Sequence, residues 1–347
     1  MLGAFALAAL TAFIASLVLN LVAIRAALRL GFLDQPGSEA HKQHATAVPY
    51  GGGLAMAIAF ALAVGVGLAL STQAIDAPTG RRLAVIGAGA LVLLAVGLAD
   101  DRRPLRARAK FAAQAAVCAA TVWAADLALD SLRPYGVVAY LAAWAWMVLV
   151  TNAYNLLDHA DGFAATVAGI SACVLFSGSV LAGDLAAATV WLALIGTLAG
   201  FLCWNRPPAR IYMGDAGSLP LGFLIAAGTL TVVFWPSTEN AGSPLAVCAP
   251  LLITAIPLFD TAAVVVKRLR RRKPVMEGDR RHISHRMARL GLSPRAALLA
   301  VAALQVALAA GAIQLRGQDW LTGAIVLLQA LAIVLAVVLL ETARDAQ

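Results

Sequence analysis

Long apolar stretches dominate the sequence and limit what this chain can fold into. A helix needs roughly 20 apolar residues to cross a bilayer, and lipid tolerates no open sheet edge, so such stretches predict membrane-spanning helices. The sequence therefore predicts an all-α, polytopic membrane bundle of about eleven helices, forming a single domain over residues 1–347. The stretches lie at about 3–24, 50–71, 83–99, 109–129, 136–151, 163–183, 185–204, 218–235, 244–266, 297–315 and 320–341.

The composition excludes most other classes of protein. Of the 347 residues, 61% are hydrophobic and only 13% are charged, whereas about a quarter are charged in a typical soluble domain. These values argue against a soluble enzyme, a disordered chain, a collagen or a disulfide scaffold. The net charge of +8 is high enough for a nucleic-acid binder, but in a membrane protein the placement of charge matters more than its sum. We therefore expect membrane lipids, and no nucleic acid, as partners.

The placement of Lys and Arg predicts the orientation in the membrane. Of the 26 Lys and Arg residues, 22 fall in the loops after the odd-numbered stretches or in the C-terminal tail. Cytoplasmic loops are enriched in Lys and Arg. The N-terminus should therefore lie outside and the C-terminus in the cytoplasm. All five histidines fall on this cytoplasmic side, together with the acidic motifs described next.

A pair of adjacent carboxylates, Asp100 and Asp101, ends the third stretch. Neighbouring carboxylates repel each other and usually need a cation, a proton or a metal. Lys110 and Gln114 follow on the next predicted helix, four residues apart and so on one face. We interpret the pair as a paired acidic site; the alternative is a solvated helix end flanked by arginines.

Polar residues also recur at every third position after the fifth stretch. On a helix, successive members would be neighbours, and four such side chains at the end of a span are expensive to desolvate. A functional stripe explains them better than a solvated helix end does. Its members are Asn152, Asn155, Asp158 and Asp161.

Asp215 lies between two glycines, just before the stretch that begins near Ser218. Two interpretations stay open here. Asp215 could cap the helix that follows, or it could bind a metal while the first N–H groups of that helix meet a phosphate. Asn205 lies on the same loop.

Two further loops carry basic residues that suit a diphosphate. His282 and His285 lie three positions apart, on one face if helical, although an ordinary polar loop is the alternative. Lys42 and His44 occupy the first cytoplasmic loop. The oxygen-rich acidic residues favour Mg²⁺, or else Mn²⁺, with Asp215 as first ligand and Asp100 as the next candidate. Together these residues suit phosphoryl transfer from a nucleotide to a lipid.

Taken in order, five motifs resemble those of the polyprenyl-phosphate N-acetylhexosamine-1-phosphate transferases. From Leu33 to about Gly291 the chain reads DD…K…Q, NxxNxxDxxDG, N-x-PPA-x-I-x-MGDAGS, PLFDT and DR-x-H-x-x-H. The resemblance implies a bacterial inner-membrane enzyme with an active site facing the cytoplasm. It would transfer a sugar 1-phosphate, first of all GlcNAc 1-phosphate, from a UDP-sugar to undecaprenyl phosphate, using Mg²⁺ and releasing UMP.

The resemblance also implies roles for individual residues. Asp100, Asp101, Lys110, Asp158, His282 and His285 would be catalytic, and Asp215 with Asp100 would hold the metal. The substrate-binding residues would be Lys42, His44, Asn152, Asn155, Asp161, Asn205 and, near the uridine, Tyr212. Asp260 of PLFDT has no role that the residues themselves indicate.

Two positions depart from the family pattern. Ser284 stands where the usual HIHH has a histidine, and His159 stands where the stripe is usually followed by glycine. The triple histidine of the phospho-MurNAc-pentapeptide transferases is absent, which argues against that alternative donor. A secondary transporter is the main alternative of another class, but transporters usually show repeated halves and sites at the membrane midplane. Direct and covalent mechanisms, and a homodimer, stay open.

Overall fold

The computed structural model describes residues 2–34, 47–71, 75–232, 244–270, 272, 282–316 and 319–345, and within them the chain is almost entirely helical. The α-helices are α1 (Leu2–Leu30), α2 (Gly52–Ala69), α3 (Ala77–Arg102), α4 (Ala107–Ala124), α5 (Val137–Leu157), α6 (Phe163–Ala182), α7 (Leu185–Asn205), α8 (Gly214–Thr231), α9 (Ala249–Ile253), α10 (Ala255–Arg270), α11 (Ile283–Arg289), α12 (Pro294–Gln314) and α13 (Trp320–Asp345). Two 3-10 helices, η1 (Asp130–Tyr135) and η2 (Pro244–Cys248), and a two-stranded antiparallel hairpin, β1 (Leu33–Asp34) with β2 (Val48–Pro49), complete the described elements.

Each apolar stretch of the sequence corresponds to one long helix, or to the α9–α10 pair. Several helices start at a side-chain cap: Asp76, Asp184 and Ser293 each accept a hydrogen bond from the N–H three residues on, at 3.1, 2.9 and 3.3 Å. Such caps satisfy backbone donors that have no partner within the helix. The fifth stretch extends into the polar segment after it, because α5 continues to Leu157.

The outer surface is apolar enough for a membrane protein. Among the described residues, eight helices are long and apolar enough to cross a bilayer, and the bent α9–α10 pair would make nine. Large side chains such as Leu91, Leu321 and Leu331 are more than 60% exposed. Soluble monomers rarely expose extended apolar patches. The fold is thus that of an all-α polytopic membrane protein.

Helix α8 forms the centre of the bundle. Every residue from Ala216 to Thr229 is buried, and α8 packs against α2, α3, α5 and α6. Two glycines let neighbouring helices touch its backbone. A Cβ on Gly53 would lie 2.3 Å from the Gly217 nitrogen, and one on Gly97 would lie 2.3 Å from the Asp215 carbonyl. The start of α8 is therefore held tightly between α2 and α3.

One span is broken in the middle of the bundle. Helices α9 and α10 meet at an angle of 76° next to Thr254. The carbonyl of Ile253 accepts hydrogen bonds from Ser171 Oγ at 2.7 Å and Gln305 Nε2 at 2.6 Å, while Gln305 Oε1 accepts one from the Ile256 N–H at 3.2 Å. Side chains from α6 and α12 thereby satisfy the backbone groups that the break releases, as a membrane interior requires.

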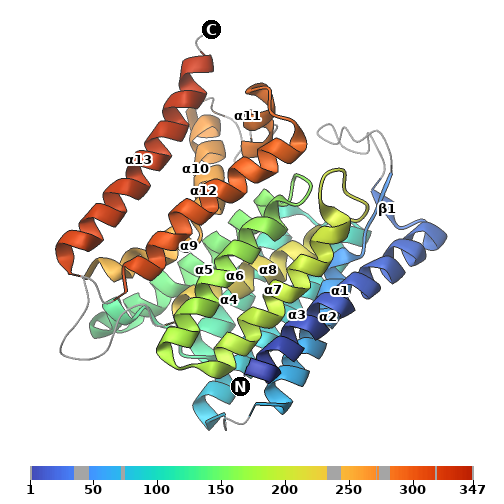
Figure 1. The fold of residues 1–347 in the computed structure, drawn as a ribbon, viewed down its shortest axis with the longest axis horizontal. Coiled ribbons are helices and arrows are strands. Elements are labelled where there is room, and N and C mark those ends of the chain that lie inside the picture. Colours follow the sequence, from blue (N-terminus) through green and yellow to red (C-terminus); the bar gives the residue numbers. More distant parts are fainter. Residues whose placement is uncertain are drawn as a thin grey trace.

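The loops that carry the sequence motifs meet at one end of the bundle. Figure 1 shows α11 and the β1 hairpin at the end where the C-terminus lies, and the N-terminus at the opposite end. Backbone hydrogen bonds join the hairpin to the segment before α8: Tyr212 donates to Pro49, and Gly52 donates to Tyr212. Arg295 Nε, at the start of α12, donates to the Pro207 carbonyl. These bonds draw distant segments around the start of α8.

Candidate active site

Three carboxylates and a lysine meet where α3, α4 and α8 come together. Lys110 Nζ, near the start of α4, donates to Asp100 Oδ2 at 3.1 Å and also to Asp215 Oδ2. Asp100 Oδ1 accepts from the Leu105 N–H at 2.7 Å. The sequence predicted that the acidic pair and Lys110 belong to one site, and the structure brings them together with Asp215.

Asp101 caps helix α8 from a different helix. Its two oxygens accept from the N–H groups of Asp215 at 2.8 Å and Ala216 at 3.1 Å. Gly214 makes room for this carboxylate: its φ is +63°, and a Cβ there would lie 2.5 Å from Asp101 Oδ2. A negative charge at a helix N-terminus is favourable.

This cap corrects two expectations for the start of α8. The helix begins at Gly214 and not near Ser218, and the N–H groups of Asp215 and Ala216 bind Asp101, so these two groups are not free to meet a phosphate. The interpretation of Asp215 as the cap of its own helix is also wrong. Its side chain turns to the neighbouring helices, with Oδ2 on Lys110 and Oδ1 accepting from Asn155 Nδ2 at 2.9 Å.

The stripe at the end of α5 divides into two parts. Asn152 and Asn155 lie on the helix, but α5 ends at Leu157, so the expectation that all four residues follow one helix is wrong. Asn152 donates to its own helix, at the Val148 carbonyl. Asp161 lies in the following loop and accepts from the Ala209 N–H at 2.8 Å. The structure thus brings Asn155 to Asp215 and uses Asp161 to hold the loop before α8.

Asp158 is a half-buried carboxylate, and in the described part of the chain no hydrogen bond or ion pair holds its side chain. Burial raises its pKa well above the usual value, and the charges of Asp215, Asp101 and Asp161 raise it further. An adjacent negative charge disfavours ionisation. Asp158 is therefore the carboxyl group at this site that is suited to exchange a proton.

Asn205 and Tyr212 shape the loop beside these carboxylates. Asn205 is buried; its Oδ1 accepts from the Gly162 N–H at 2.9 Å and its Nδ2 donates to the Ile211 carbonyl at 2.8 Å. The Tyr212 ring lies 6.2 Å from that of Tyr50, edge to face. Burial raises the pKa of Tyr212, as do the nearby Asp161, Asp34 and Asp158 carboxylates. Lys42 and His44 lie outside the described residues.

The segment that carries His282 and His285, called the histidine loop below, contacts His159 at the end of α5. The rings of His159 and His282 stack at 4.2 Å between centroids, and His285 on α11 lies 6.0 Å from His159. His159 Nε2 bonds to Ser284 Oγ and its Nδ1 to the Leu156 carbonyl. Burial lowers the pKa of His159 to about 3, helped by the nearby His282, so its ring is neutral at physiological pH.

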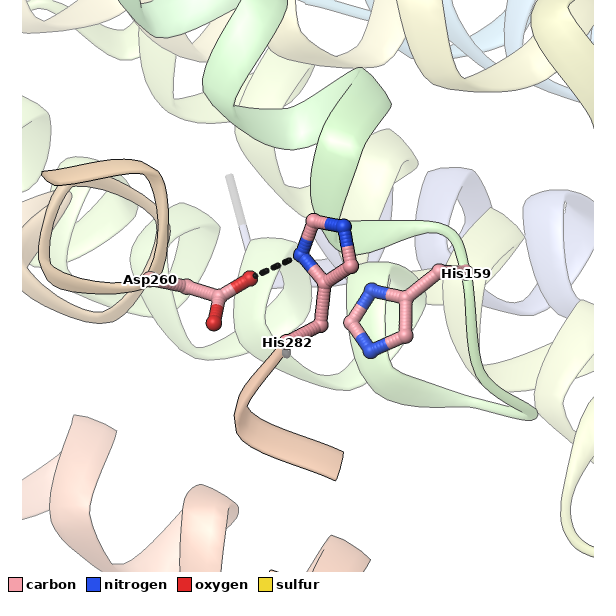
Figure 2. A group of neighbouring side chains, drawn as sticks. All are labelled: His159, Asp260 and His282. Atoms are coloured by element: carbon pink, nitrogen blue, oxygen red, sulfur yellow. Dashed lines mark hydrogen bonds and ion pairs between the residues drawn. The ribbon is translucent and has the colours of Figure 1, made fainter. Parts of the chain in front are cut away.

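Sequence reasoning missed that His159 and Asp260 contact this loop from other parts of the chain. The unusual residues at 159 and 284 were the available signal, since both depart from the family pattern and they touch each other. Asp260, on α10, accepts a hydrogen bond from His282 Nδ1 at 2.8 Å (Figure 2). It also accepts one from the Ile283 N–H at 2.6 Å. Asp260 and His282 lie 22 positions apart, so no local sequence pattern connects them.

Within the described residues, the ligand atoms of His159, Asp260 and His282 lie within 4.8 Å of one another, close enough for a metal site. The orientation of the rings does not suit one. An imidazole binds a metal in its own plane, but the His159 and His282 rings are stacked with only 25° between their planes, so their lone pairs do not converge. Both nitrogens of His159 already have hydrogen-bond partners. We interpret the cluster as a hydrogen-bonded assembly.

Comparison with known proteins identifies the family. Residues 83–233, from α3 to the end of α8, match glycosyl transferase family 4. A protein of Bacillus subtilis named as a probable undecaprenyl-phosphate N-acetylglucosaminyl 1-phosphate transferase is 30% identical over 293 residues, covering 82% of this chain and 77% of the relative. The chain belongs to the polyprenyl-phosphate N-acetylhexosamine-1-phosphate transferases.

Further members of this transferase family give the same result. The undecaprenyl-phosphate alpha-N-acetylglucosaminyl 1-phosphate transferase of Yersinia pestis is 30% identical over 309 residues, covering 83% of this chain and 78% of the relative. The decaprenyl-phosphate N-acetylglucosaminephosphotransferase of Mycolicibacterium smegmatis is 30% identical over 301 residues, covering 79% and 73%. The segment matched by the family model contains every carboxylate around α8, whereas the histidine loop lies beyond it.

Proposed function

We propose that this chain transfers N-acetylhexosamine 1-phosphate from a UDP-sugar to undecaprenyl phosphate and releases UMP, with GlcNAc 1-phosphate as the first candidate for the transferred group. The reaction would be the first membrane step in assembling a cell-envelope polysaccharide. The observation that carries the proposal is the group of carboxylates and Lys110 around the start of α8, at one end of an apolar bundle. The names of the relatives indicate the acceptor and the sugar phosphate.

The site would face the cytoplasm of a bacterial inner membrane. We infer eleven crossings, made by α1 to α8, the α9–α10 pair, α12 and α13, with the N-terminus outside and the C-terminus inside. The enrichment of Lys and Arg in the loops at the active-site end supports this orientation. The termini at opposite ends of the bundle agree with an odd number of crossings (Figure 1). A lipid phosphate would then arrive from the membrane and a nucleotide sugar from the cytoplasm.

In the reaction, an oxygen of the lipid phosphate would attack the phosphorus that bears the sugar, and the bond from that phosphorus to UMP would break. Asp158 is the carboxyl group best placed to exchange a proton with the lipid phosphate, because Asp100 and Asp101 are occupied by hydrogen bonds. Its raised pKa makes it, once ionised, a stronger base than an ordinary carboxylate. Asp101 would keep α8 in position. In a covalent route the same Asp158 would attack first, so trapping of a phospho-aspartate distinguishes the two.

The residues present fit a divalent cation. Four carboxylates, those of Asp100, Asp101, Asp158 and Asp215, lie near one another, and Lys110 contacts only Asp100 and Asp215. Burial raises the pKa of Asp158, and the neighbouring carboxylates raise it further. Asp215 and Asp100 would hold Mg²⁺, or else Mn²⁺, which prefers oxygen ligands. When bound, it would neutralise charge on the donor diphosphate. Lys110 contacts both ligand side chains and would hold them together.

The remaining residues would bind substrate. His282 and His285 would meet the donor diphosphate from the α11 side. Asn155 and Asp161 would bind substrate beside Asp158, and Tyr212 would lie near the uridine. Asn152, Asn205, Lys42 and His44 complete the proposed binding residues. We retain UDP-MurNAc-pentapeptide as the alternative donor to be tested, and no observation favours a transporter.

Purified protein in lipid nanodiscs tests this proposal. We expect UMP release that requires UDP-GlcNAc, undecaprenyl phosphate and Mg²⁺ together, and little release with UDP-MurNAc-pentapeptide. UDP-GalNAc and UDP-QuiNAc should complete the donor panel. Asp158→Asn should remove most turnover, while Asp126→Asn serves as control, because Asp126 lies with Tyr140 and Arg133 at the other end of the bundle. Absence of UMP with every donor would overturn the proposal.

A further inference from the structure

Asp260 is an almost fully buried carboxylate with three hydrogen-bond donors. It is 1% exposed and accepts from His282 Nδ1 at 2.8 Å, from the Ile283 N–H at 2.6 Å and from Arg286 Nη2 at 3.0 Å. A buried charge is tolerated when it is paired and fully hydrogen-bonded. All three donors belong to the start of α11, so Asp260 on α10 fixes the segment that carries His282.

The hydrogen bond from His282 determines which ring nitrogen carries a proton. A carboxylate only accepts hydrogen bonds, so Nδ1 of His282 must be protonated. Within the described chain, Nε2 has no partner, and Figure 2 shows it on the side of the ring away from Asp260. Nε2 is therefore the one ring nitrogen that can meet a phosphate oxygen or exchange a proton.

The other face of the His282 ring is covered by His159. The two rings stack at 4.2 Å with 25° between their planes. His159 is itself held on both sides: Nδ1 donates to the Leu156 carbonyl at 2.9 Å, and Nε2 accepts from the Ser284 hydroxyl. His159 directly follows Asp158, so this stack connects the histidine loop to the carboxylate that we assign to proton transfer.

We propose that Asp260 is a positioning residue that holds His282 in its Nδ1–H tautomer with Nε2 turned to the substrate, and that the His159–Ser284 pair secures the opposite face of the ring. The catalytic consequence rests on the proposed function, whereas the tautomer does not. A carboxylate that orients a histidine through Nδ1 is a general device of enzyme sites. The competing explanation is that Asp260 only anchors α11, through Ile283 and Arg286.

A double-mutant cycle separates the two explanations. Asp260→Asn keeps the shape and an oxygen for the Ile283 N–H, but its amide would donate to His282 and so favour the wrong tautomer. We expect kcat to fall about 10- to 100-fold. In a His282→Gln background, the same change should alter kcat by less than about 3-fold, because the group on which it acts is already gone. An equal loss in both backgrounds would support the anchor alone and overturn the proposal.

The tautomer is measured without turnover, so it is informative even if the enzyme uses another substrate. The chain has five histidines, and ¹⁵N shifts of ¹⁵N-histidine-labelled protein distinguish the two neutral tautomers. We expect His282 and His159 both to carry the proton on Nδ1 in the wild type, with assignment by His282→Gln. Finding His282 protonated only at Nε2 would overturn the proposal, also in the case that Asp260→Asn does not fold.

The His159–Ser284 contact leads to a separate prediction. The usual HIHH motif has a histidine at position 284, but in this chain Ser284 Oγ touches His159 Nε2, so a second imidazole would compete for the same space. We now expect Ser284→His to lower kcat about 10-fold or more, and His159→Gly to restore most of the loss in the double variant. Normal kcat for Ser284→His alone, or no recovery in the double variant, would contradict a positioning role for the pair.

Discussion

Gly97 provides the sharpest test of how the site is positioned. It lies on α3, one turn before Asp101, where α3 crosses the start of α8. A Cβ at this position would lie 2.3 Å from the carbonyl carbon and oxygen of Asp215 and 2.4 Å from the Ala216 nitrogen. Ordinary van der Waals contact begins at 3.4 Å. Gly97→Ala therefore requires the two backbones to separate by about 1.1 Å.

That separation acts on both stability and turnover. Overpacking costs about 1–3 kcal/mol, and strain on the Asp101 cap adds about 0.5–2 kcal/mol. The better helix propensity of alanine offsets about 1 kcal/mol of this loss of stability. We expect a net destabilisation of about 0.5–4 kcal/mol. Because Asp101 and Asp215 would also move apart, and a misplacement of 1 Å can lower a rate about 100-fold, kcat should fall by that order.

Gly87→Ala is the matched control, since it introduces the same methyl group on the same helix. A Cβ on Gly87 meets nothing within 4 Å, so this variant should keep its kcat and gain up to about 1 kcal/mol of stability. UMP release and the thermal midpoint in detergent measure both effects. Equal kcat and equal midpoints for the two variants would refute the argument that α3 and α8 are in backbone contact at the site.

Four further outcomes are expected. Asp158→Asn should lose turnover yet stay folded. Because the wild-type pKa of Asp158 is raised, the folded state keeps a proton that the unfolded chain releases above about pH 4, so the stability of the wild type should decline as pH rises. Thermal midpoints measured across pH should show a flatter decline for the Asn variant. Gln305→Leu should lower stability by about 1–3 kcal/mol, because the Ile256 N–H at the helix break loses its acceptor while the Ile253 carbonyl keeps its bond from Ser171; thermal unfolding against Gln305→Glu, which keeps an acceptor, measures the loss. Lys110→Met should lower the thermal midpoint in EDTA more than in Mg²⁺, because the cation replaces the missing charge; an equal drop in both would speak against a metal beside Asp215. In a cysteine-free background, Cys at position 106 should react with an impermeant reagent only after permeabilisation, whereas Cys at the exposed Ser131 should react from outside; the reverse pattern would invert the proposed orientation.

Much of the fold follows from local sequence. The apolar stretches predict the helices because lipid-facing helices must be apolar along their length. Among the features that the sequence did not indicate are the break at Thr254 and the short helix α11. The break depends on Gln305, 51 positions away from Thr254, and α11 has only seven residues. Local periodicity carries no information about either.

The sequence predicted which residues form the site better than it predicted how those residues are arranged. Asp100, Lys110 and Asp215 were expected in one site because their residue types suit a phosphate and a cation, and the structure joins them. A cap on α8 was one of two interpretations left open for Asp215, because a cap usually comes from the helix itself; the cap comes instead from Asp101, 114 positions away. The role of Asp260 was invisible for the same reason, since its partners are on another helix.

The most direct test of the proposed reaction follows the phosphorus atom. UDP-GlcNAc carrying ³²P in the phosphate next to the sugar is incubated with the purified protein, undecaprenyl phosphate and Mg²⁺. The proposed transfer of sugar 1-phosphate predicts that ³²P moves into the organic-soluble lipid product and that the released nucleotide is unlabelled UMP, with both lost in Asp158→Asn. If the sugar reached the lipid while ³²P stayed in UDP, or if no label entered the lipid, the central claim would be contradicted.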